Sequence, residues 1–249
     1  MNQVWLYAII SVIIVSLISL IGLVTISVKI KKLKKIIIYF VSFAAGALFG
    51  GAFIHLLPEA IEETSSTLTI FLFVLIGIIF LFIIEKIVNW RHCHDLECKG
   101  HPSPFAYTNL VGDGIHNFID GLIIGAAYLV NFQVGIATTI AVVLHEIPQE
   151  IGDFGVLIHA GFSKAKALWF NFLTALTAII GAIVALSLST HIENLTMFLI
   201  PFAAGSFIYI AGSDLIPELH KEVKVSKSII QLIVFILGIA IIFSLLLLE

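Results

Sequence analysis

Apolar residues in this chain occur in eight long blocks that are separated by short polar connections. The blocks cover residues 4–28, 36–57, 67–88, 107–130, 134–159, 166–188, 195–217 and 228–248. A helix of about 20 residues crosses a hydrocarbon layer about 30 Å thick, and it satisfies its own backbone amides, as lipid requires. The pattern therefore predicts an all-α polytopic membrane protein with eight transmembrane helices.

The composition supports this fold class and excludes others. Hydrophobic residues make up 60% of the 249 residues and charged residues 12%, whereas soluble proteins contain about 25% charged residues. A water-soluble globular protein is excluded, and no basic surface is available for a nucleic-acid partner. Residues 1–249 are expected to form a single transmembrane domain in a lipid bilayer.

The basic residues predict the orientation of the chain. All 13 Lys and Arg residues lie within or beside the connections that follow the first, third, fifth and seventh blocks, and the other three connections carry none. Because cytosolic loops of membrane proteins are rich in Lys and Arg, the pattern places both termini outside the cytosol. The small size without a luminal domain favours the cell (inner) membrane of a prokaryote.

An internal repeat relates the second and seventh blocks. Residues 43–60 align without gaps on residues 202–219, with eight of 18 positions identical, including the Pro-Glu pairs at 58–59 and 217–218. The copies lie an odd number of crossings apart, so they run in opposite directions through the bilayer. Inverted repeats around a midplane site are typical of secondary transporters, although two small-residue helices that each end at a proline would also look alike.

The fourth and fifth blocks carry polar residues that a lipid-facing helix does not tolerate. They are Asp113, His116, Asn117 and Asp120 in the fourth block, and His145, Glu146, Gln149, Glu150 and Asp153 in the fifth. The first set lies on one helical stripe, and each charge costs about 2.5–3.5 kcal/mol at the bilayer centre. The two sets are therefore expected to meet near the midplane, where imidazoles and carboxylates together suit a divalent transition metal.

Four motifs resemble those of the ZIP (Zrt/Irt-like) divalent metal transporters. HNFIDG at 116–121 and HEIPQEIGDF at 145–154 are similar to that family's fourth and fifth spans, in particular in the branch with an HEXPHE motif. HLLPEA at 55–60 and DLIPEL at 214–219 resemble its second and seventh spans. The resemblance implies a 3+2+3 arrangement, with helices 1–3 inverted against helices 6–8 around central helices 4 and 5. It implies transport toward the cytosol by alternating access, often in a homodimer, and no enzymatic activity.

The resemblance also implies a binuclear metal site between the fourth and fifth helices, with Asp120 bridging two ions. Carried over residue by residue, the ligands are His116, Asn117, Asp120, His145, Glu146 and Gln149, and Glu150 is a further candidate. Gln149 departs from the HEXPHE pattern, which has a second His there, so selectivity among zinc, iron, manganese and cadmium stays open. The metal is expected as transported substrate, and no cofactor is expected.

Further polar residues outline a path for a cation across the membrane. From the outer to the inner mouth they are His55, Glu59, Asp113, Asp153, His159, Asp214 and Glu218. For His55 and Asp214, the alternative is an ordinary polar residue at the membrane interface. The sixth block adds no carboxylate and offers only Asn171, Thr174 and Thr177. The second metal position is therefore expected to be the weaker one.

The cytosolic connection at 89–106 holds five further potential ligands. They are His92, Cys93, His94, Cys98 and His101. In a reducing cytosol the two cysteines are expected as thiols or metal ligands, not as a disulfide. Their spacing does not match a closed structural zinc site, so the segment is interpreted either as a site that captures released metal or as an ordinary flexible loop.

Three other functions compete with uptake. An intramembrane zinc metalloprotease is suggested by HEIPQ at 145–149, but this segment lacks the second His of HExxH. A metal exporter of the cation-diffusion type also uses His and Asp pairs within the membrane, but generally has fewer spans and a cytosolic C-terminal domain. The third alternative is a metal-sensing receptor without transport activity, and the inverted repeat argues against it.

Overall fold

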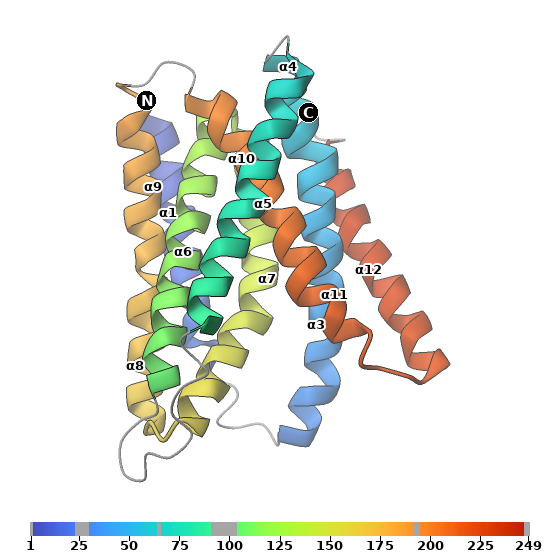
Figure 1. Ribbon diagram of the computed structural model, residues 1–249. Coiled ribbons are helices and arrows are strands. Elements are labelled where there is room, and N and C mark those ends of the chain that lie inside the picture. The colour runs from blue at the N-terminus through green and yellow to red at the C-terminus, as the bar shows by residue number, and fades with distance from the viewer. Residues whose placement is uncertain (1, 23–29, 64–65, 91–103, 192–194, 247–249) are drawn as a thin grey trace.

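A computed structural model describes residues 2–22, 30–63, 66–90, 104–191 and 195–246 (Figure 1). Across these ranges the chain forms helices joined by short turns, and no described residue lies in a strand. The first part contains α1 (Asn2–Ile18) with the 3-10 turn η1 (Ser19–Ile21), α3 (Ile30–Gly50), the π-helical turn η2 (Gly51–Leu56), α4 (Leu57–Glu63) and α5 (Thr67–Trp90). The second part contains α6 (Pro104–Val130), α7 (Phe132–His159), α8 (Lys164–Ala175), α9 (Thr177–Leu188), α10 (Leu195–Tyr209), the π-helical turn η4 (Ile210–Leu215), α11 (Ile216–Leu219) and α12 (Val225–Leu246).

The molecule is an integral membrane protein made of helices. Six segments of the described chain are long and apolar enough to cross a bilayer: Gln3–Ile21, Ile38–Glu62, Thr67–Ile87, Lys164–Leu188, Leu195–Leu219 and Val225–Ser244. Helices α6 and α7, with 27 and 28 residues, are long enough but carry the polar residues of the fourth and fifth blocks. The lower hydropathy of these two helices therefore comes from their polar side chains, which the sequence pattern had indicated as candidate metal ligands.

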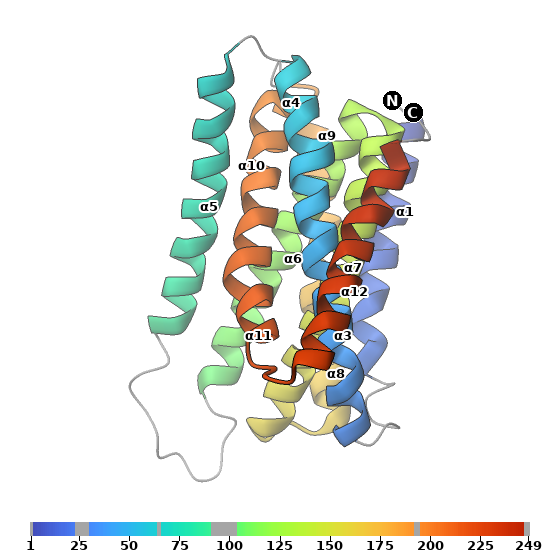
Figure 2. The ribbon, with the colours of Figure 1, turned by 90° about the vertical axis from the view of Figure 1, so that its right-hand side faces the viewer.

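Helices α6 and α7 pack against each other, and several other helices cover them. Helix α6 contacts α1, α8, α9 and α10, while α7 contacts α1, α3 and α8. Figure 2 shows α5 at one edge of the bundle, beside α10. The start of α1 and the end of α12 lie at the same end of the bundle (Figures 1 and 2). The polar stripes of α6 and α7 are thereby withdrawn from the lipid-facing surface.

The sequence repeat is also a structural repeat. An offset of 159 residues places Gly51 on Ile210 and Leu56 on Leu215, so the two π-helical turns η2 and η4 occupy equivalent positions. Each turn directly precedes a helical segment, α4 or α11, whose second residue is the repeated proline, Pro58 or Pro217. Single π-helical turns inside longer helices are rare and frequently mark functional sites.

Equivalent glycines hold the two repeat helices against their neighbours. A Cβ atom on Gly46 of α3 would lie 2.0 Å from the Phe235 carbonyl oxygen of α12, and one on Gly205 of α10 would lie 2.1 Å from the Val74 carbonyl oxygen of α5. At both crossings the backbones approach too closely for any side chain. The α3–α12 and α10–α5 pairs are thus built alike.

Candidate metal centre

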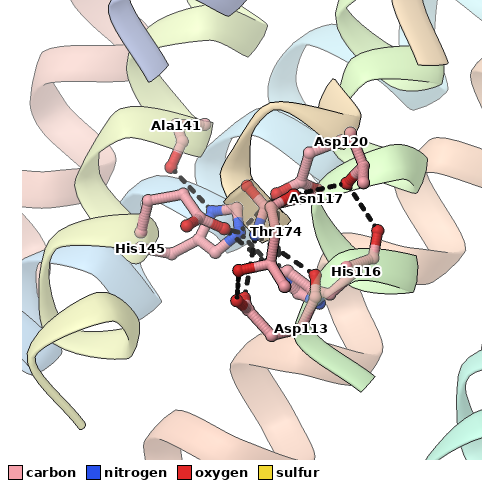
Figure 3. A network of polar contacts seen from close by, with 10 residues as sticks. Asp113, His116, Asn117, Asp120, Ala141, His145 and Thr174 are labelled. Carbon is pink, nitrogen blue, oxygen red and sulfur yellow. Dashed lines mark hydrogen bonds and ion pairs between the residues drawn. The ribbon is translucent and has the colours of Figure 1, made fainter. Parts of the chain in front are cut away.

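Four side chains from α6 and α7 converge into one group, in which three residues are buried and His116 is half-buried. His116 and Asp120 lie one turn apart on α6, and His145 and Glu146 are adjacent on α7. The Nε2 atoms of the two histidines are 3.2 Å apart, and Asp120 Oδ2 lies 3.1 Å from His145 Nε2 and 3.5 Å from His116 Nε2. Glu146 Oε1 lies 3.5 Å from His116 Nε2 and 3.6 Å from His145 Nε2. Figure 3 shows residues of this group together with their neighbours.

These distances match the separations between ligands of one metal ion. Four ligand atoms at about 2.0–2.1 Å from a tetrahedral zinc ion lie about 3.3 Å from one another. The five separations given above fall between 3.1 and 3.6 Å. Two imidazoles and two carboxylates also form a donor set that zinc and its neighbours in the first transition row accept.

The backbone fixes how His145 presents its ring. Its Nδ1 lies 3.1 Å from the carbonyl oxygen of Ala141, one turn earlier in α7. A carbonyl oxygen only accepts a hydrogen bond, so Nδ1 carries the proton and Nε2 of the neutral ring keeps its lone pair. This hydrogen bond aims Nε2 at Asp120 and His116, as outer-shell partners of metal-bound histidines do.

The surroundings of the group contain more buried acceptors than donors. On α6, α7 and α8, six buried oxygens of Asn, Asp and Glu side chains have no hydrogen-bond partner among the described residues: Asn117 Oδ1, Asp120 Oδ1, Glu146 Oε1, Glu146 Oε2, Glu150 Oε1 and Asn171 Oδ1. A buried polar atom without a partner costs about 1–3 kcal/mol, and more if it is charged. Buried oxygens that accept no hydrogen bond are available to coordinate a cation.

Helices α8 and α9 hold the polar stripes of α6 and α7 in place. The Thr174 hydroxyl donates to Asp113 Oδ2 at 2.5 Å, and Asn117 Nδ2 donates to Asp113 Oδ1 at 2.8 Å (Figure 3). Asn171 Nδ2 donates to a carboxylate oxygen of Glu150, and the Thr177 hydroxyl donates to the Gly114 carbonyl at 2.6 Å. Helices α8 and α9, which form the sixth block, thus supply hydrogen bonds that position acidic residues of α6 and α7. The composition of this block alone did not reveal that role.

A cavity of about 640 Å³ leads away from the group toward one end of the bundle. His116, Gln149 and Asp113 line it next to the group. Asp153, Asp214 and Glu218, all expected along a cation path, also line it. The cavity therefore connects this group of His and acidic side chains with the cytosol-directed ends predicted for α7, α10 and α11, which precede connections rich in basic residues.

The other expected path residues lie elsewhere. His55 is 3% exposed, and its Nε2 lies 3.0 Å from the Ile242 carbonyl oxygen of α12. Glu59 is half-buried in α4, and neither residue lines the cavity. Helix α7 ends at His159, whose side chain lies outside the described part of the structure. The segment that holds His92, Cys93, His94, Cys98 and His101 lies outside the described residues as well.

Three cavity residues were not anticipated. Asn109 Nδ2 donates to Asp153 Oδ1 at 2.9 Å, and the Tyr209 hydroxyl donates to the carboxylate of Glu85. All three line the cavity together with Asp153. Glu85 could have been noticed as an acidic residue within the third apolar block, whereas Asn109 and Tyr209 have no distinguishing spacing.

Comparison with known proteins identifies relatives along most of the chain. The family described as ZIP Zinc transporter matches residues 2–105 and 91–246. "Zinc transporter zipt-7.1" of Caenorhabditis briggsae is 31% identical over 278 residues, which cover 84% of this chain and 71% of that protein. "Zinc transporter ZIP13 homolog" of Drosophila melanogaster is 33% identical, covering 80% of this chain and 74% of that protein. "Zinc transporter ZIP13" of Pongo abelii is 34% identical, and the match spans 64% of its length.

Proposed function

Because this chain belongs to the ZIP zinc transporter family, we propose that it carries zinc or a similar divalent transition metal into the cytoplasm. The observation that carries this proposal is the buried group of His116, Asp120, His145 and Glu146, whose ligand atoms all lie within 4.8 Å of one another. The protein is a transporter and not an enzyme. The metal is its substrate.

The proposed topology has eight spans. Helices α6 and α7 join the six apolar segments as the central fourth and fifth spans, with spans 1–3 inverted against spans 6–8. The equivalent positions of η2 and η4, and of Gly46 and Gly205, support this 3+2+3 arrangement. The basic connections are proposed to face the cytosol, with both termini outside and the chain in a prokaryotic inner membrane.

Transport is proposed to proceed by alternating access around the metal centre. The cavity extends from His116 to Glu218, on the proposed cytosolic side, which supports the proposal that this conformation is inward-facing. A metal that leaves the centre would exchange imidazole and carboxylate ligands for water, with Asp113, Asp153 and Asp214 along the way. Successive anionic groups lower the energy of a dication along a path through lipid.

A second ion is proposed beside the first, bridged by Asp120. The oxygens Asp120 Oδ1, Glu146 Oε2 and Asn117 Oδ1 have no hydrogen-bond partner among the described residues, so they are free to accept a cation. Gln149 lines the adjoining cavity. Glu150 is bound by Asn171, which makes it a more distant candidate ligand. These oxygen donors favour a weaker and less zinc-selective second position.

Uptake is expected to fall in acid. Imidazole nitrogen binds a metal only when it carries no proton, so protons compete with the metal at His116 and His145. The expected result is a progressive loss of uptake as the external pH is lowered from 7 to 5. Initial rates of dye-reported metal entry into proteoliposomes at fixed free metal measure this. Equal rates at pH 7 and pH 5 would contradict imidazole ligation.

Gln149→His is expected to shift selectivity toward zinc. An imidazole nitrogen at this position in the cavity adds a ligand that zinc prefers over the neutral amide oxygen. Competition of zinc, iron, manganese and cadmium for uptake gives the order of metal preference for the variant and for the unmodified protein. Gln149→Asn is the matched control, because it keeps an amide and should leave the ranking unchanged. An unaltered ranking in the His variant would show that this side chain does not contact the metal.

The test of the proposed function is metal entry into proteoliposomes that contain the purified chain. A transporter gives protein-dependent entry that saturates with metal concentration, whereas a metalloprotease or a metal-sensing receptor gives none. A cation-diffusion exporter would move metal from the cytosolic face. Measuring metal entry separately for each orientation of the protein in the liposomes therefore distinguishes an exporter from an uptake transporter.

We also propose a homodimer, since exposed apolar residues cover α5 and α12. Cross-linking in liposomes tests this oligomeric state.

A further inference from the structure

The side-chain amide of Asn117 is held at one end only. Its Nδ2 donates to Asp113 Oδ1 at 2.8 Å and lies 3.2 Å from the main-chain oxygen of Asp113 (Figure 3). Its Oδ1 is buried and accepts no hydrogen bond from any described residue. A primary amide carries its donors on nitrogen and its acceptor on oxygen. The nitrogen of this amide is therefore satisfied, while its oxygen is available to a cation.

Asp113 determines which end of the amide faces it. A main-chain carbonyl oxygen only accepts hydrogen bonds, and an ionised carboxylate also only accepts. The group of Asn117 that faces these two oxygens of Asp113 must therefore be the NH2 group. A reversed amide would bring its oxygen against two other oxygens and would turn its nitrogen to the opposite side.

Helix α8 holds Asp113 in this position. The Thr174 hydroxyl donates to Asp113 Oδ2, so both oxygens of this carboxylate accept a hydrogen bond. Asp113 is buried, and its two partners lie on different helices, α8 and α6. The sequence predicts Asp113 on the cation path, and the structure adds that its oxygens are already engaged. Such a carboxylate is well suited to orient a neighbouring side chain.

The orientation of the Asn117 amide matters because of where this residue lies. Asn117 precedes Asp120 by three residues, which places both on one face of α6. Asp120 Oδ1 is also buried without a hydrogen-bond partner among the described residues. An amide nitrogen in place of the Asn117 oxygen would present donors to a cation, which needs acceptors. The direction of the amide therefore decides whether Asn117 can serve as a ligand.

We propose that Asp113, held by Thr174, is a positioning residue that keeps the amide oxygen of Asn117 turned toward the second ion. The proposal rests on the second ion of the proposed function, for which Asn117 and Asp120 supply oxygens. Asp113 acts through Asn117 and does not itself coordinate this ion. Its effect should therefore appear in the affinity for the second ion and not in the affinity for the first.

Two substitutions of Asp113 separate orientation from charge. Asp113→Leu and Asp113→Asn remove the same negative charge, and both new side chains branch at Cγ. Asparagine keeps an oxygen that can accept from Asn117 Nδ2. Its nitrogen can donate to the Thr174 hydroxyl, which has the Asn171 carbonyl oxygen at 2.8 Å as an alternative acceptor. Leucine offers no acceptor, so the Asn117 amide is free to rotate.

Calorimetric titration of zinc into the purified full chain in lipid nanodiscs gives the affinity for each ion. The potential ligands of the connection at 89–106 are first replaced by serine, so that they bind no zinc: His92, Cys93, His94, Cys98 and His101. Changes to outer-shell partners of a metal cost about 10- to 100-fold in affinity. Asp113→Leu should bind the second zinc ion more weakly than Asp113→Asn by about this factor, with equal affinity for the first.

Two controls test whether the effect passes through Asn117. Asp153 also lines the cavity, but it accepts a hydrogen bond from Asn109, which is not a proposed ligand. Asp153→Leu and Asp153→Asn should therefore bind the second ion with equal affinity. In an Asn117→Leu background, which lacks the amide oxygen, the two Asp113 variants should also become equal, because residues that act through one contact are not additive.

Three results would overturn the positioning role. They are equal second-ion affinities of Asp113→Leu and Asp113→Asn, an equally large difference between the two Asp153 variants, and a difference that persists in the Asn117→Leu background. Melting temperatures show whether each variant folds. Asp113→Ala, which also lacks an acceptor, replaces Asp113→Leu if the leucine variant unfolds.

The same measurements distinguish failure of this role from failure of the proposed function. Binding of a single zinc ion by the chain with native Asp113 would remove both the second ion and the positioning role. Metal entry into proteoliposomes is measured separately with the unmodified chain. Entry that persists leaves the proposed transport standing whatever the titrations show, whereas absence of entry refutes transport itself.

Discussion

Asp120→Asn is expected to abolish metal uptake while the protein remains folded. Asp120 Oδ2 lies within 3.1–3.5 Å of both histidine Nε2 atoms, and its Oδ1 is buried without a hydrogen-bond partner among the described residues. Even changes to outer-shell partners of a metal cost about 10- to 100-fold in affinity or activity. Asp120 is a charged ligand that is proposed to bridge two ions, so its loss should lower uptake by more than this factor. Initial uptake rates in proteoliposomes measure the effect.

The fold should tolerate this substitution well. Asp120 is 1% exposed, and asparagine has nearly the same size and can place a donor group beside the Nε2 atom of His145, so the packing of this group is kept. A melting temperature close to that of the unmodified chain is expected. Glu62→Gln is the matched control, because it removes one carboxylate charge at an exposed position of α4. Near-normal uptake by a folded Asp120→Asn variant would remove Asp120 from the transport site.

Gly181→Ala is expected to destabilise the protein and to impair uptake together. A Cβ atom at this position of α9 would lie 2.0 Å from the Phe118 carbonyl oxygen of α6, between His116 and Asp120 in sequence. Overpacking of this kind costs about 1–3 kcal/mol, or a fall in melting temperature of roughly 2–12 °C for a chain of this size. Helix α6 must move to relieve the clash, and its metal ligands move with it.

Gly155→Ala separates this steric effect from a general effect of glycine replacement. Gly155 also lies within a long helix, α7, but no described atom lies within 4 Å of a Cβ built there. Alanine favours helix over glycine by about 1 kcal/mol, so this variant should be as stable as the original or more so. Equal melting temperatures for the two alanine variants would show that the α6–α9 crossing does not require Gly181.

Some features of the protein could be read from the sequence because they follow from local spacing. Bilayer thickness sets the length of apolar blocks, and helical periodicity places His116 and Asp120 on one stripe. The polar residues of α6 and α7 then had to face each other, since lipid excludes them. The structure brings together four of the seven residues expected as metal ligands, and the comparisons confirm the family that the motifs at 116–121 and 145–154 indicated.

Other features depend on how helices rotate and cross, which spacing does not determine. The sequence predicts His55 near the outer mouth but does not indicate its partner, and in the structure the orientation of η2 places its ring against the Ile242 carbonyl. Asn171 and Thr174 seemed to be weak ligand candidates, whereas the position of α8 makes them hydrogen-bond donors to Glu150 and Asp113. The pairing of Tyr209 with Glu85 joins residues 124 positions apart and has no local signal.

The zinc K-edge absorption spectrum of the purified chain, loaded with one equivalent of zinc, tests most directly whether α6 and α7 form the transported ion's binding site. The expected spectrum shows zinc with nitrogen and oxygen neighbours at about 2.0–2.1 Å, including the outer-ring scattering of two imidazoles. A His116→Ala, His145→Ala double variant should lose the imidazole contribution. An identical spectrum in the double variant, or a sulfur neighbour at about 2.3 Å, would place the metal elsewhere and contradict its binding between α6 and α7.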